Sequence, residues 1–263
     1  MNPTIARAPA DLPTSLSPPK TALVTGAGRR IGAHIARRLH AEGFDVAVHF
    51  NRSGIEAQAL CDGLNQTRAD SAIALQADLR SKQGCDNLLL AYRHWRPALA
   101  LLVNNASVFE RTPFGDVTEQ AWQAQLDGNL KPAFFVSQAA LPALHLSLGG
   151  SIINICDARW DKPLPGFSAY ASAKAAIVAL TRGLSVELAP QIRVNAIGPG
   201  SLDWPEGGTF TPEQIIALQA AIPLRRIGSG DDIADAVLYL AAASSYVTGQ
   251  IINVDGGISA VSV

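Results

Sequence analysis

Short runs of apolar residues alternate with amphipathic segments along most of the chain. Polar, Gly or Pro residues bound the runs, as is typical of strands buried on both faces of a parallel sheet. The runs lie at residues 21–25, 46–50, 72–76, 99–103, 152–156, 192–197 and 250–254. Helical patterns lie between them at residues 31–42, 55–68, 82–95, 118–145 and 231–242, and an Ala-rich helix that contains Tyr170 ends at Leu188, before Pro190.

This alternation of strands and helices predicts an α/β fold. Its expected form is a single doubly wound, Rossmann-type domain with about seven parallel strands flanked by helices. We expect one domain over residues 20–263, since this part of the sequence shows neither an internal repeat nor a second domain. Residues 1–19 hold five prolines among Ala, Ser and Thr. We interpret them as a flexible N-terminal tail, since they lack the apolar segment of a secretory signal.

Composition narrows the possible classes of function. The chain is 263 residues long, 48% hydrophobic and 16% charged, with a formal net charge of −1. These values favour a substantial core and give no electrostatic reason to expect a nucleic acid or an anionic membrane as partner. No apolar run is long enough for a transmembrane helix. Cys61, Cys85 and Cys156 are widely spaced, which indicates reduced thiols in a cytoplasmic protein rather than disulfides or a metal site.

A glycine-rich turn follows the first strand and leads into the first helix. It reads Gly-Ala-Gly-Arg-Arg-Ile-Gly over residues 26–32. Backbone N–H groups in such a turn can approach a pyrophosphate, and the helix N-terminus favours negative charge. On its own, Arg30 is also compatible with an ordinary solvated helix residue. The turn predicts a dinucleotide site that includes Gly26, Arg29, Arg30, Ile31 and Gly32.

The end of the second strand indicates which dinucleotide binds. NAD-binding proteins place an Asp or Glu there, which accepts a hydrogen bond from the ribose 2′-hydroxyl. This chain has Asn51, Arg52 and Ser53 instead. A guanidinium and a hydroxyl suit a 2′-phosphate, so NADPH/NADP+ is the expected cofactor. On its own, Arg52 is also compatible with a plain surface residue.

A tyrosine, a lysine and an aspartate carry the candidate chemistry. Tyr170 and Lys174 are four residues apart at the start of a helix, which puts both side chains on one helix face. Asp157 follows the fifth strand, at the edge where parallel sheets place their chemistry. Because an ammonium favours a nearby phenolate, we expect Lys174 to lower the pKa of Tyr170. A Tyr-x-x-x-Lys pair also occurs by chance in solvated helices.

Three motifs together resemble the short-chain dehydrogenase/reductase family. The similarity covers nearly the whole chain, from about Lys20 to Gly257. It implies the doubly wound fold and a nicotinamide cofactor, and it implies a homotetramer, because tetramers predominate among such proteins. The motifs are Tyr170-x-x-x-Lys174, the glycine turn, and Asn104-Asn105-Ala106.

Two positions depart from the common pattern of that family and resemble its pteridine reductase subgroup. Asp157 stands where most members have a serine, and Arg30 replaces the middle glycine of the turn. In the subgroup this arginine faces both cofactor phosphate and substrate. An aromatic residue two positions after a serine stacks a flat ring against the nicotinamide in that subgroup, and Ser107 and Phe109 match the spacing. The alternative for Phe109 is a core residue.

The resemblance implies further site residues. Asn129 matches a helix asparagine that holds a water near the lysine, and residues 201–213, which include Trp204, have the composition of a mobile substrate lid. The implied catalytic residues are Asn129, Asp157, Tyr170 and Lys174. The implied substrate contacts are Arg30, Ser107, Phe109, Asp157, Tyr170 and Trp204. The implied cofactor contacts, besides those already given, are Asp78, Leu79, Asn105, Ala106, Ser107, Tyr170, Lys174, Pro199, Gly200 and Ser201.

These residues predict an NADPH-dependent reductase of pterins, which converts a dihydropterin to a tetrahydropterin and could also accept oxidised pterins or dihydrofolate. Tyr170 would supply the proton. An ionised Asp157 would repel the charge that develops on a ketone oxygen, whereas it can accept hydrogen bonds from ring N–H groups. Two alternatives stay open. One is a ketoreductase of 3-oxoacyl or sugar substrates, and the other is a cofactor-sensing regulator without catalysis.

Overall fold

A seven-stranded parallel sheet forms the centre of the computed structural model. Its strand order is β3-β2-β1-β4-β5-β6-β7 and every pairing is parallel, which confirms the predicted doubly wound fold. The strands are β1 (Thr21–Val24), β2 (Asp45–Phe50), β3 (Ala72–Gln76), β4 (Leu101–Asn104), β5 (Gly150–Ile155), β6 (Ile192–Pro199) and β7 (Ile251–Val254).

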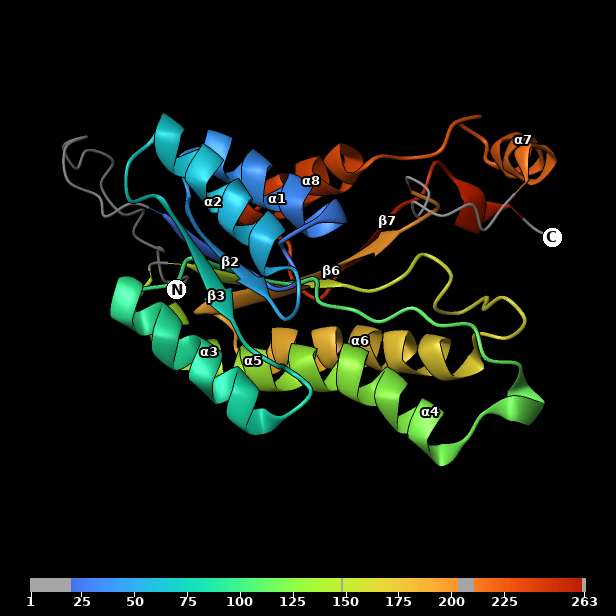
Figure 1. Ribbon diagram of the computed structural model, residues 1–263, viewed down its shortest axis with the longest axis horizontal. Helices are drawn as coiled ribbons and strands as arrows, with labels where there is room; N and C mark the ends of the chain where they lie inside the picture. Colours follow the sequence, from blue (N-terminus) through green and yellow to red (C-terminus); the bar gives the residue numbers. More distant parts are fainter. Residues whose placement is uncertain (1–19, 148, 203–210, 262–263) are drawn as a thin grey trace, which may run out of the picture.

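Helices cover both faces of this sheet, as Figure 1 shows. The helices α1, α2 and α8 lie on one face, and α3, α5 and α6 lie on the other, with α4 continuing that layer outward. The helix α7 lies at the periphery, beyond β7. The helices are α1 (Arg30–Ala41), α2 (Gly54–Thr67), α3 (Lys82–Trp95), α4 (Glu119–Gln125), α5 (Lys131–Leu144), α6 (Ser168–Glu187), α7 (Pro212–Ala221) and α8 (Gly230–Leu238).

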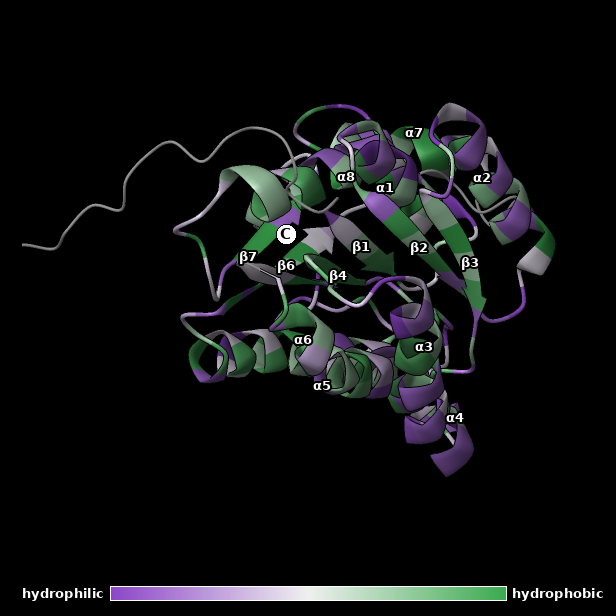
Figure 2. Ribbon diagram, turned by 90° about the vertical axis from the view of Figure 1, so that its left-hand side faces the viewer, coloured by the Kyte–Doolittle hydropathy of each residue, from purple (hydrophilic) through white to green (hydrophobic). Residues whose placement is uncertain are grey.

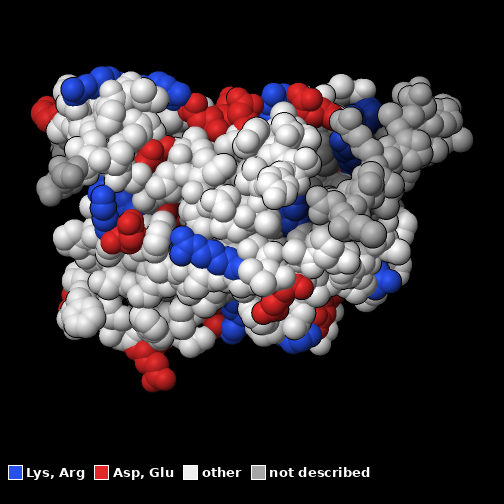
Figure 3. Space-filling model, turned by 180° about the vertical axis from the view of Figure 1, so that it is seen from behind, with Lys and Arg blue, Asp and Glu red and all other residues white. Residues whose placement is uncertain are grey.

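The structure describes residues 20–147, 149–202 and 211–261. The expected tail, residues 1–19, and Trp204 of the expected lid lie outside these ranges. Within them, no helix combines the length and the apolar character that a bilayer crossing requires. Basic and acidic side chains are interspersed on the face that Figure 3 presents.

The apolar core has two main layers, one on each side of the sheet. Alternate residues of one strand face opposite layers: Val24 packs with Ile35 of α1, and Leu23 packs with Leu88 of α3. All four side chains are fully buried, and such burial contributes roughly 1.5–3 kcal/mol for each large aliphatic side chain. Figure 2 shows the hydrophobic strands between the helical layers and hydrophilic residues along much of α4. The two layers hold the carboxyl ends of the strands in fixed positions.

The strand order reverses between β1 and β4. Successive strands extend the sheet to one side from β1 to β3 and to the other side from β4 to β7. The loops that follow β1 and β4 meet at this point of the carboxyl edge, where Asn105 and Ala106 bond to Thr25 and Gly26, and open α/β sheets bind ligands at this position. The glycine turn leaves β1 at this point, and residues 105–109 leave β4.

The helical region predicted over residues 118–145 is present, but it is not one regular α-helix. The chain forms α4, then a π-helical turn, η2 (Leu126–Leu130), and then α5. A π-turn inserts one residue without changing the apolar pattern enough to be recognised, and such turns often occur at functional sites. Here the turn contains Asn129, whose amide donates to the carbonyl of Val108 (3.1 Å) in the loop that follows β4.

A buried row of polar side chains, which we call the polar ladder, joins the two central strands to two helices. Asn104 of β4 donates through Nδ2 to Oγ of Ser137 in α5 and to Oδ1 of Asn154 in β5, both at 2.9 Å. Asn154 in turn donates to Oγ1 of Thr181 in α6, also at 2.9 Å. The four residues are at most 6% exposed. Among the described residues, Oδ1 of Asn104 has no hydrogen-bond partner.

Candidate active site

The glycine turn is held from two sides. On one side, the N–H of Gly26 donates to the ring nitrogen Nδ1 of His49 (3.0 Å), and the N–H of Ala27 donates to the His49 carbonyl (2.8 Å). On the other side, the amide of Asn105 donates to the carbonyls of Thr25 (2.8 Å) and Gly26 (3.1 Å). The first two N–H groups of the turn are therefore committed, and an anion would be bound by the groups that follow them.

The start of α1 has the shape that a close phosphate contact requires. Gly26 has a φ of 63°, a conformation that favours glycine. A side chain at Gly32 would place its Cβ only 2.5 Å from the carbonyl oxygen of Gly26, so the helix can approach the turn only with glycine there. Arg29 and Arg30 are both exposed at this helix N-terminus, next to Ile31. These features fit the pyrophosphate of a dinucleotide.

The loop after β2 lies directly beside the turn. A Cβ added to Gly28 would come within 2.5 Å of the Ser53 hydroxyl oxygen, which brings the predicted group Asn51, Arg52 and Ser53 close to the turn. Asn51 and Arg52 are exposed, and in the part of the chain that the structure describes Arg52 forms no ion pair. This position suits a cationic contact to the adenosine half of a dinucleotide.

The loop after β3 adds an acidic group to the same edge. Asp78 accepts two hydrogen bonds from Nε of Arg80, at 2.9 and 3.1 Å, and the Arg80 guanidinium lowers the pKa of Asp78 to about 2. Leu79 is 4% exposed and packs in the core layer formed with α3. Asp78 is therefore accessible and ionised, whereas Leu79 faces inward.

The tyrosine and the aspartate are in direct contact. The O–H of Tyr170 donates to Oδ2 of Asp157 at 2.8 Å, and the N–H of Arg159 donates to Oδ1 at 2.7 Å. Lys174 lies one turn below in α6, and its ammonium donates to the carbonyl of Ile155 at 3.0 Å. Tyr170 is 9% exposed and Lys174 only 2%. The sequence prediction that these three side chains meet at the end of β5 agrees with this geometry.

The expectation that Lys174 lowers the pKa of Tyr170 is wrong in this structure. Burial raises the pKa of Tyr170 far above its ordinary value, and the nearby Asp157 carboxylate raises it further. Burial also lowers the pKa of Lys174, to about 8, so the lysine is still mainly protonated at pH 7 but loses its charge at a much lower pH than an exposed lysine. Tyr170 therefore keeps its proton and holds it in the bond to Asp157.

Asn129 anchors the loop that follows β4. Its side-chain oxygen accepts a hydrogen bond from the Ser107 hydroxyl at 2.6 Å, and its amide donates to the carbonyls of Val108 and Gln125 at 3.1 and 2.9 Å. Asn129 is 1% exposed, whereas Ser107 is exposed. Ala106, next to Ser107, donates through its N–H to the Thr25 hydroxyl (2.9 Å). The loop is thus tied both to the π-turn and to β1.

Phe109 forms the aromatic front of the site. Its ring stacks on that of Phe167, with centroids 4.6 Å apart and planes inclined by 14°, and it meets the Tyr170 ring edge-on at 4.9 Å. Because the side chain is 66% exposed, Phe109 is not a core residue. A backbone hydrogen bond from Thr112 to the Gly166 carbonyl (2.8 Å) ties the two loops together. One face of the Phe109 ring is covered by Phe167.

The end of β6 closes the edge on the far side of Asp157. The N–H of Ala158 donates to the Pro199 carbonyl at 3.0 Å, and the N–H of Gly200 donates to the Val254 carbonyl at 3.0 Å. Ser201 accepts through its carbonyl from the N–H of Gly228 at 3.1 Å. The predicted group Pro199, Gly200 and Ser201 therefore lies beside the Asp157 segment.

Two residues of the site carry no motif that could have identified them in the sequence. Phe167 stands three residues before Tyr170, but its pairing with Phe109 depends on two separate loops. His49 lies inside the apolar run of residues 46–50, where nothing in the spacing distinguishes it from its neighbours. The three cysteines are buried and unpaired, as expected, and burial raises the pKa of the Cys156 thiol, next to Asp157, to about 11.

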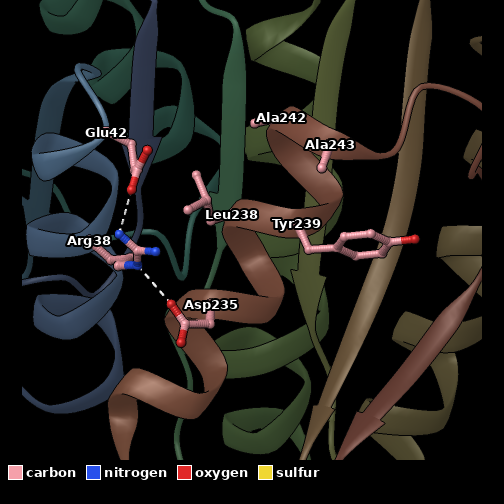
Figure 4. Close-up of a pocket in the computed structure, with 7 residues that line it drawn as sticks. All are labelled: Arg38, Glu42, Asp235, Leu238, Tyr239, Ala242 and Ala243. Carbon is pink, nitrogen blue, oxygen red and sulfur yellow. Dashed lines mark hydrogen bonds and ion pairs between the residues drawn. The ribbon is translucent and has the colours of Figure 1, made fainter.

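Other parts of the surface offer less chemistry. Within the described ranges, no group of three or more His, Cys, Asp or Glu side chains could hold a metal ion. A shallow pocket of about 370 Å³ lies between α1 and α8 (Figure 4). In it, Arg38 forms ion pairs with Glu42 (2.6 Å) and Asp235 (2.7 Å). These residues lie in the later turns of α1 and α8, away from the carboxyl edge of the sheet.

Comparisons with known proteins agree with this geometry at the level of the whole chain. Residues 26–259 match the family described as "Enoyl-(Acyl carrier protein) reductase". Pteridine reductase 1 of Leishmania tarentolae is 35% identical over 90% of this chain and 96% of its own. A 3-oxoacyl-[acyl-carrier-protein] reductase of Staphylococcus aureus is also 35% identical, over 90% of this chain and 97% of its own. An uncharacterised oxidoreductase of Methylorubrum extorquens is 37% identical over 91% of this chain and 97% of its own.

Proposed function

The chain belongs to the short-chain dehydrogenase/reductase family, and we propose that it is an NADPH-dependent reductase of pterins, with a dihydropterin as substrate and a tetrahydropterin as product. As a member of that family it is an oxidoreductase that uses a nicotinamide cofactor. The proposal concerns the finer points, which are the substrate class and the preference for NADPH.

The observation that carries the proposal is the carboxylate of Asp157 within hydrogen-bond distance of Tyr170. A ketoreductase needs a neutral donor beside the tyrosine, because negative charge develops on the carbonyl oxygen of its substrate. A carboxylate there would repel that charge. Pterins instead present ring and amino N–H groups, which a carboxylate accepts. Asp157 therefore favours a nitrogen heterocycle over a ketone.

The surrounding residues support the same substrate class. The exposed ring of Phe109 is held beside Tyr170, where a planar heteroaromatic would gain offset stacking. Bound NADPH would supply the hydride, and the chain would supply the proton for the ring nitrogen from Tyr170. Since Asp157 holds that O–H, the bond between them has to break as the proton is given up. Arg30, exposed at the start of α1, would hold phosphate and substrate.

The relatives keep a ketoreductase as the second candidate. A 3-oxoacyl-[acyl-carrier-protein] reductase is as similar to this chain as pteridine reductase 1, so overall similarity does not favour either substrate. A regulator without catalysis is the weaker alternative, because both Tyr170 and Lys174 are present at the end of β5.

A side-by-side assay tests the proposal. NADPH consumption is measured with dihydrobiopterin, dihydromonapterin, dihydrofolate and an acetoacetyl thioester at equal concentrations. We expect turnover of at least one dihydropterin to exceed that of the thioester. Faster turnover of the thioester would favour the ketoreductase, and no turnover of any substrate would favour the regulator.

Substitution of Asp157 links the assay to the site. Asp157→Asn keeps the size and hydrogen-bonding capacity of the side chain but cannot relay a proton, so we expect it to lose dihydropterin turnover more than binding. Asp157→Ser restores the common family arrangement and should lower pterin turnover, roughly 100–10,000-fold for a lost proton-transfer contribution, while any remaining activity shifts toward simple carbonyls. If Asp157→Ser retains full pterin turnover with an unchanged pH–rate profile, the carboxylate has no special role.

A further inference from the structure

His49 occupies a position that the catalytic chemistry does not explain. It is the penultimate residue of β2, it is 2% exposed, and its side chain lies between the glycine turn and the end of β3. A buried histidine in a strand is usually a core residue whose polar atoms happen to be satisfied. Here both partners are backbone groups, Gly26 in the glycine turn and Ala77 after β3, and both segments are expected to contact the cofactor, which indicates a more specific role.

The hydrogen bonds of His49 determine its tautomer. The N–H of Gly26 donates to Nδ1 at 3.0 Å, so Nδ1 carries no hydrogen. The hydrogen must then be on Nε2, which lies 3.1 Å from the Ala77 carbonyl and donates to it. Burial keeps the ring neutral, because it lowers the pKa of His49 to about 4, against smaller opposing effects of the Ala77 bond and Asp78. The ring therefore accepts on one side and donates on the other.

These two bonds connect segments that would contact opposite parts of one dinucleotide. Gly26 begins the turn that fits the pyrophosphate, and its neighbour Ala27 donates to the carbonyl of the same His49. Ala77 directly precedes Asp78 and Leu79, the residues expected around the adenine. The N–H of Ala77 also donates to the Phe50 carbonyl at 3.1 Å, so residues 49 and 50 both hold the segment after β3 against β2.

We propose that His49 is a positioning residue of the cofactor site, which holds the phosphate turn and the adenine segment at a fixed separation through its Nδ1 and Nε2 atoms. It touches neither the substrate nor the reacting atoms, so it acts through Gly26 and Ala77. The proposal rests on the nicotinamide cofactor of the family and not on the pterin, so its test is independent of the substrate. The N–H of Gly26, once bound to the ring, cannot rotate toward the ligand, and the turn is preorganised.

Three substitutions separate the two bonds. His49→Asn places an amide oxygen near the position of Nδ1 and keeps an acceptor for Gly26, but it does not reach Ala77. His49→Gln extends to the position of Nε2 and keeps a donor for Ala77, but it leaves Gly26 without a partner. His49→Phe fills the space and keeps neither. His40→Phe is the matched control, because His40 is also buried (4% exposed) and bonded to a serine, Ser71, at 2.7 Å, but lies in the last turn of α1.

Cofactor affinity is measured by fluorescence titration of the whole protein with NADPH and with NADH, alongside thermal melts. We expect His49→Phe to weaken binding of the preferred cofactor about tenfold, which corresponds to the loss of one to two ordinary hydrogen bonds. His49→Asn should recover most of that loss, His49→Gln should recover less, and His40→Phe should lower the melting temperature without changing affinity. Equal affinities for His49→Phe and the parent protein would overturn the proposal.

A measurement on the parent protein covers the case in which the variants do not fold. The ¹⁵N chemical shifts of the His49 ring, recorded without added cofactor, should report a hydrogen on Nε2 and an accepting Nδ1, and the Gly26 amide should exchange slowly with solvent. A hydrogen on Nδ1, or rapid exchange at Gly26, would contradict the proposed bond. Neither of these measurements depends on enzymatic activity.

Discussion

Arg30 occupies a backbone conformation that favours glycine, with a φ of 55°. For an ordinary residue this conformation costs roughly 1–2 kcal/mol. The common family pattern has glycine at this position, which would remove the cost. An exposed arginine kept at a strained helix N-terminus is best explained by a ligand contact, and it supports the prediction that Arg30 faces phosphate and substrate. Arg29 next to it is extended, with a φ of −155°, and carries no such cost.

Arg52 is expected to determine the cofactor preference. Its exposed guanidinium lies beside the glycine turn, where charge-assisted hydrogen bonds to a 2′-phosphate favour NADPH by roughly 1–3 kcal/mol. Arg52→Ala should therefore erase most of the difference between the dissociation constants of NADPH and NADH, measured by titration. Arg37→Ala, in the exposed part of α1, is the control. Equal affinity of the parent protein for both cofactors would contradict the assignment.

The buried ammonium of Lys174 should lower the free energy of unfolding at neutral pH. Its pKa is lowered from 10.5 to about 8 by burial, so the unfolded chain binds more protons than the folded chain between these values, and stability rises with pH across that window by roughly 3 kcal/mol. We expect Lys174→Met to increase the free energy of unfolding at pH 7, because it removes the buried charge. The gain should be roughly 1–3 kcal/mol and not the full value, because the hydrogen bond to the Ile155 carbonyl is lost as well. The substitution should also abolish turnover.

Urea unfolding at pH 7 and at pH 9.5 measures this effect. The advantage of Lys174→Met should narrow at the higher pH, because the parent lysine is then largely neutral. A variant that is less stable than the parent at pH 7, or an advantage independent of pH, would show that the ammonium is well compensated in the folded protein.

At the scale of elements, hydrophobic periodicity located all seven strands. It identified the buried residues of a strand better than the residues that pair with a neighbouring strand. The fourth strand was predicted at residues 99–103 and is found at Leu101–Asn104. Leu99 is fully buried, but its N–H donates to the Ala143 carbonyl and not to a neighbouring strand. The π-turn in the helix over residues 118–145 escaped notice for a related reason, since one inserted residue hardly changes an apolar pattern.

The site was predictable where its residues belong to one local motif. The glycine turn and the Tyr170, Lys174 and Asp157 group depend on short spacings that the sequence displays directly. The pKa of Tyr170 was not predictable, because it depends on burial and on a 2.8 Å contact. The pairing of Phe109 with Phe167 joins two loops, and the bonds of His49 join three elements, so neither leaves a signal in periodicity or spacing.

The stacked rings of Phe109 and Phe167 form the proposed platform for the dihydropterin, and substitutions at both positions test this role. Because Phe109 is 66% exposed, Phe109→Ala should lower the melting temperature little, weaken dihydropterin binding, and leave NADPH affinity nearly unchanged. Phe167→Ala should weaken dihydropterin binding in the same direction, since it removes the ring that supports Phe109. Phe114→Ala is the control, because Phe114 is 83% exposed and lies nearby in the chain. Binding titrations beside thermal melts distinguish these outcomes, and an unfolded Phe109→Ala protein would contradict the platform role.

At the scale of the whole molecule, self-association is the open expectation. The resemblance implies a homotetramer, and exposed apolar side chains on two helices of one layer are compatible with it: Phe134 on α5 is 43% exposed and Val186 on α6 is 79% exposed. Light scattering during gel filtration should report about four times the chain mass of 27.6 kDa. A mass equal to one chain at micromolar concentration would contradict the expectation.

The polar ladder bears on how the molecule opens. It joins α5, β4, β5 and α6 through buried amides and hydroxyls, and moving any one of these elements away would leave a buried polar group without its partner, at roughly 1–3 kcal/mol for each group. These four elements should therefore act as one cooperative unfolding unit, with slow amide exchange governed by global opening. The loop that carries Phe109 lies outside that unit. We therefore expect local opening of the loop on the substrate side without unfolding of the central strands.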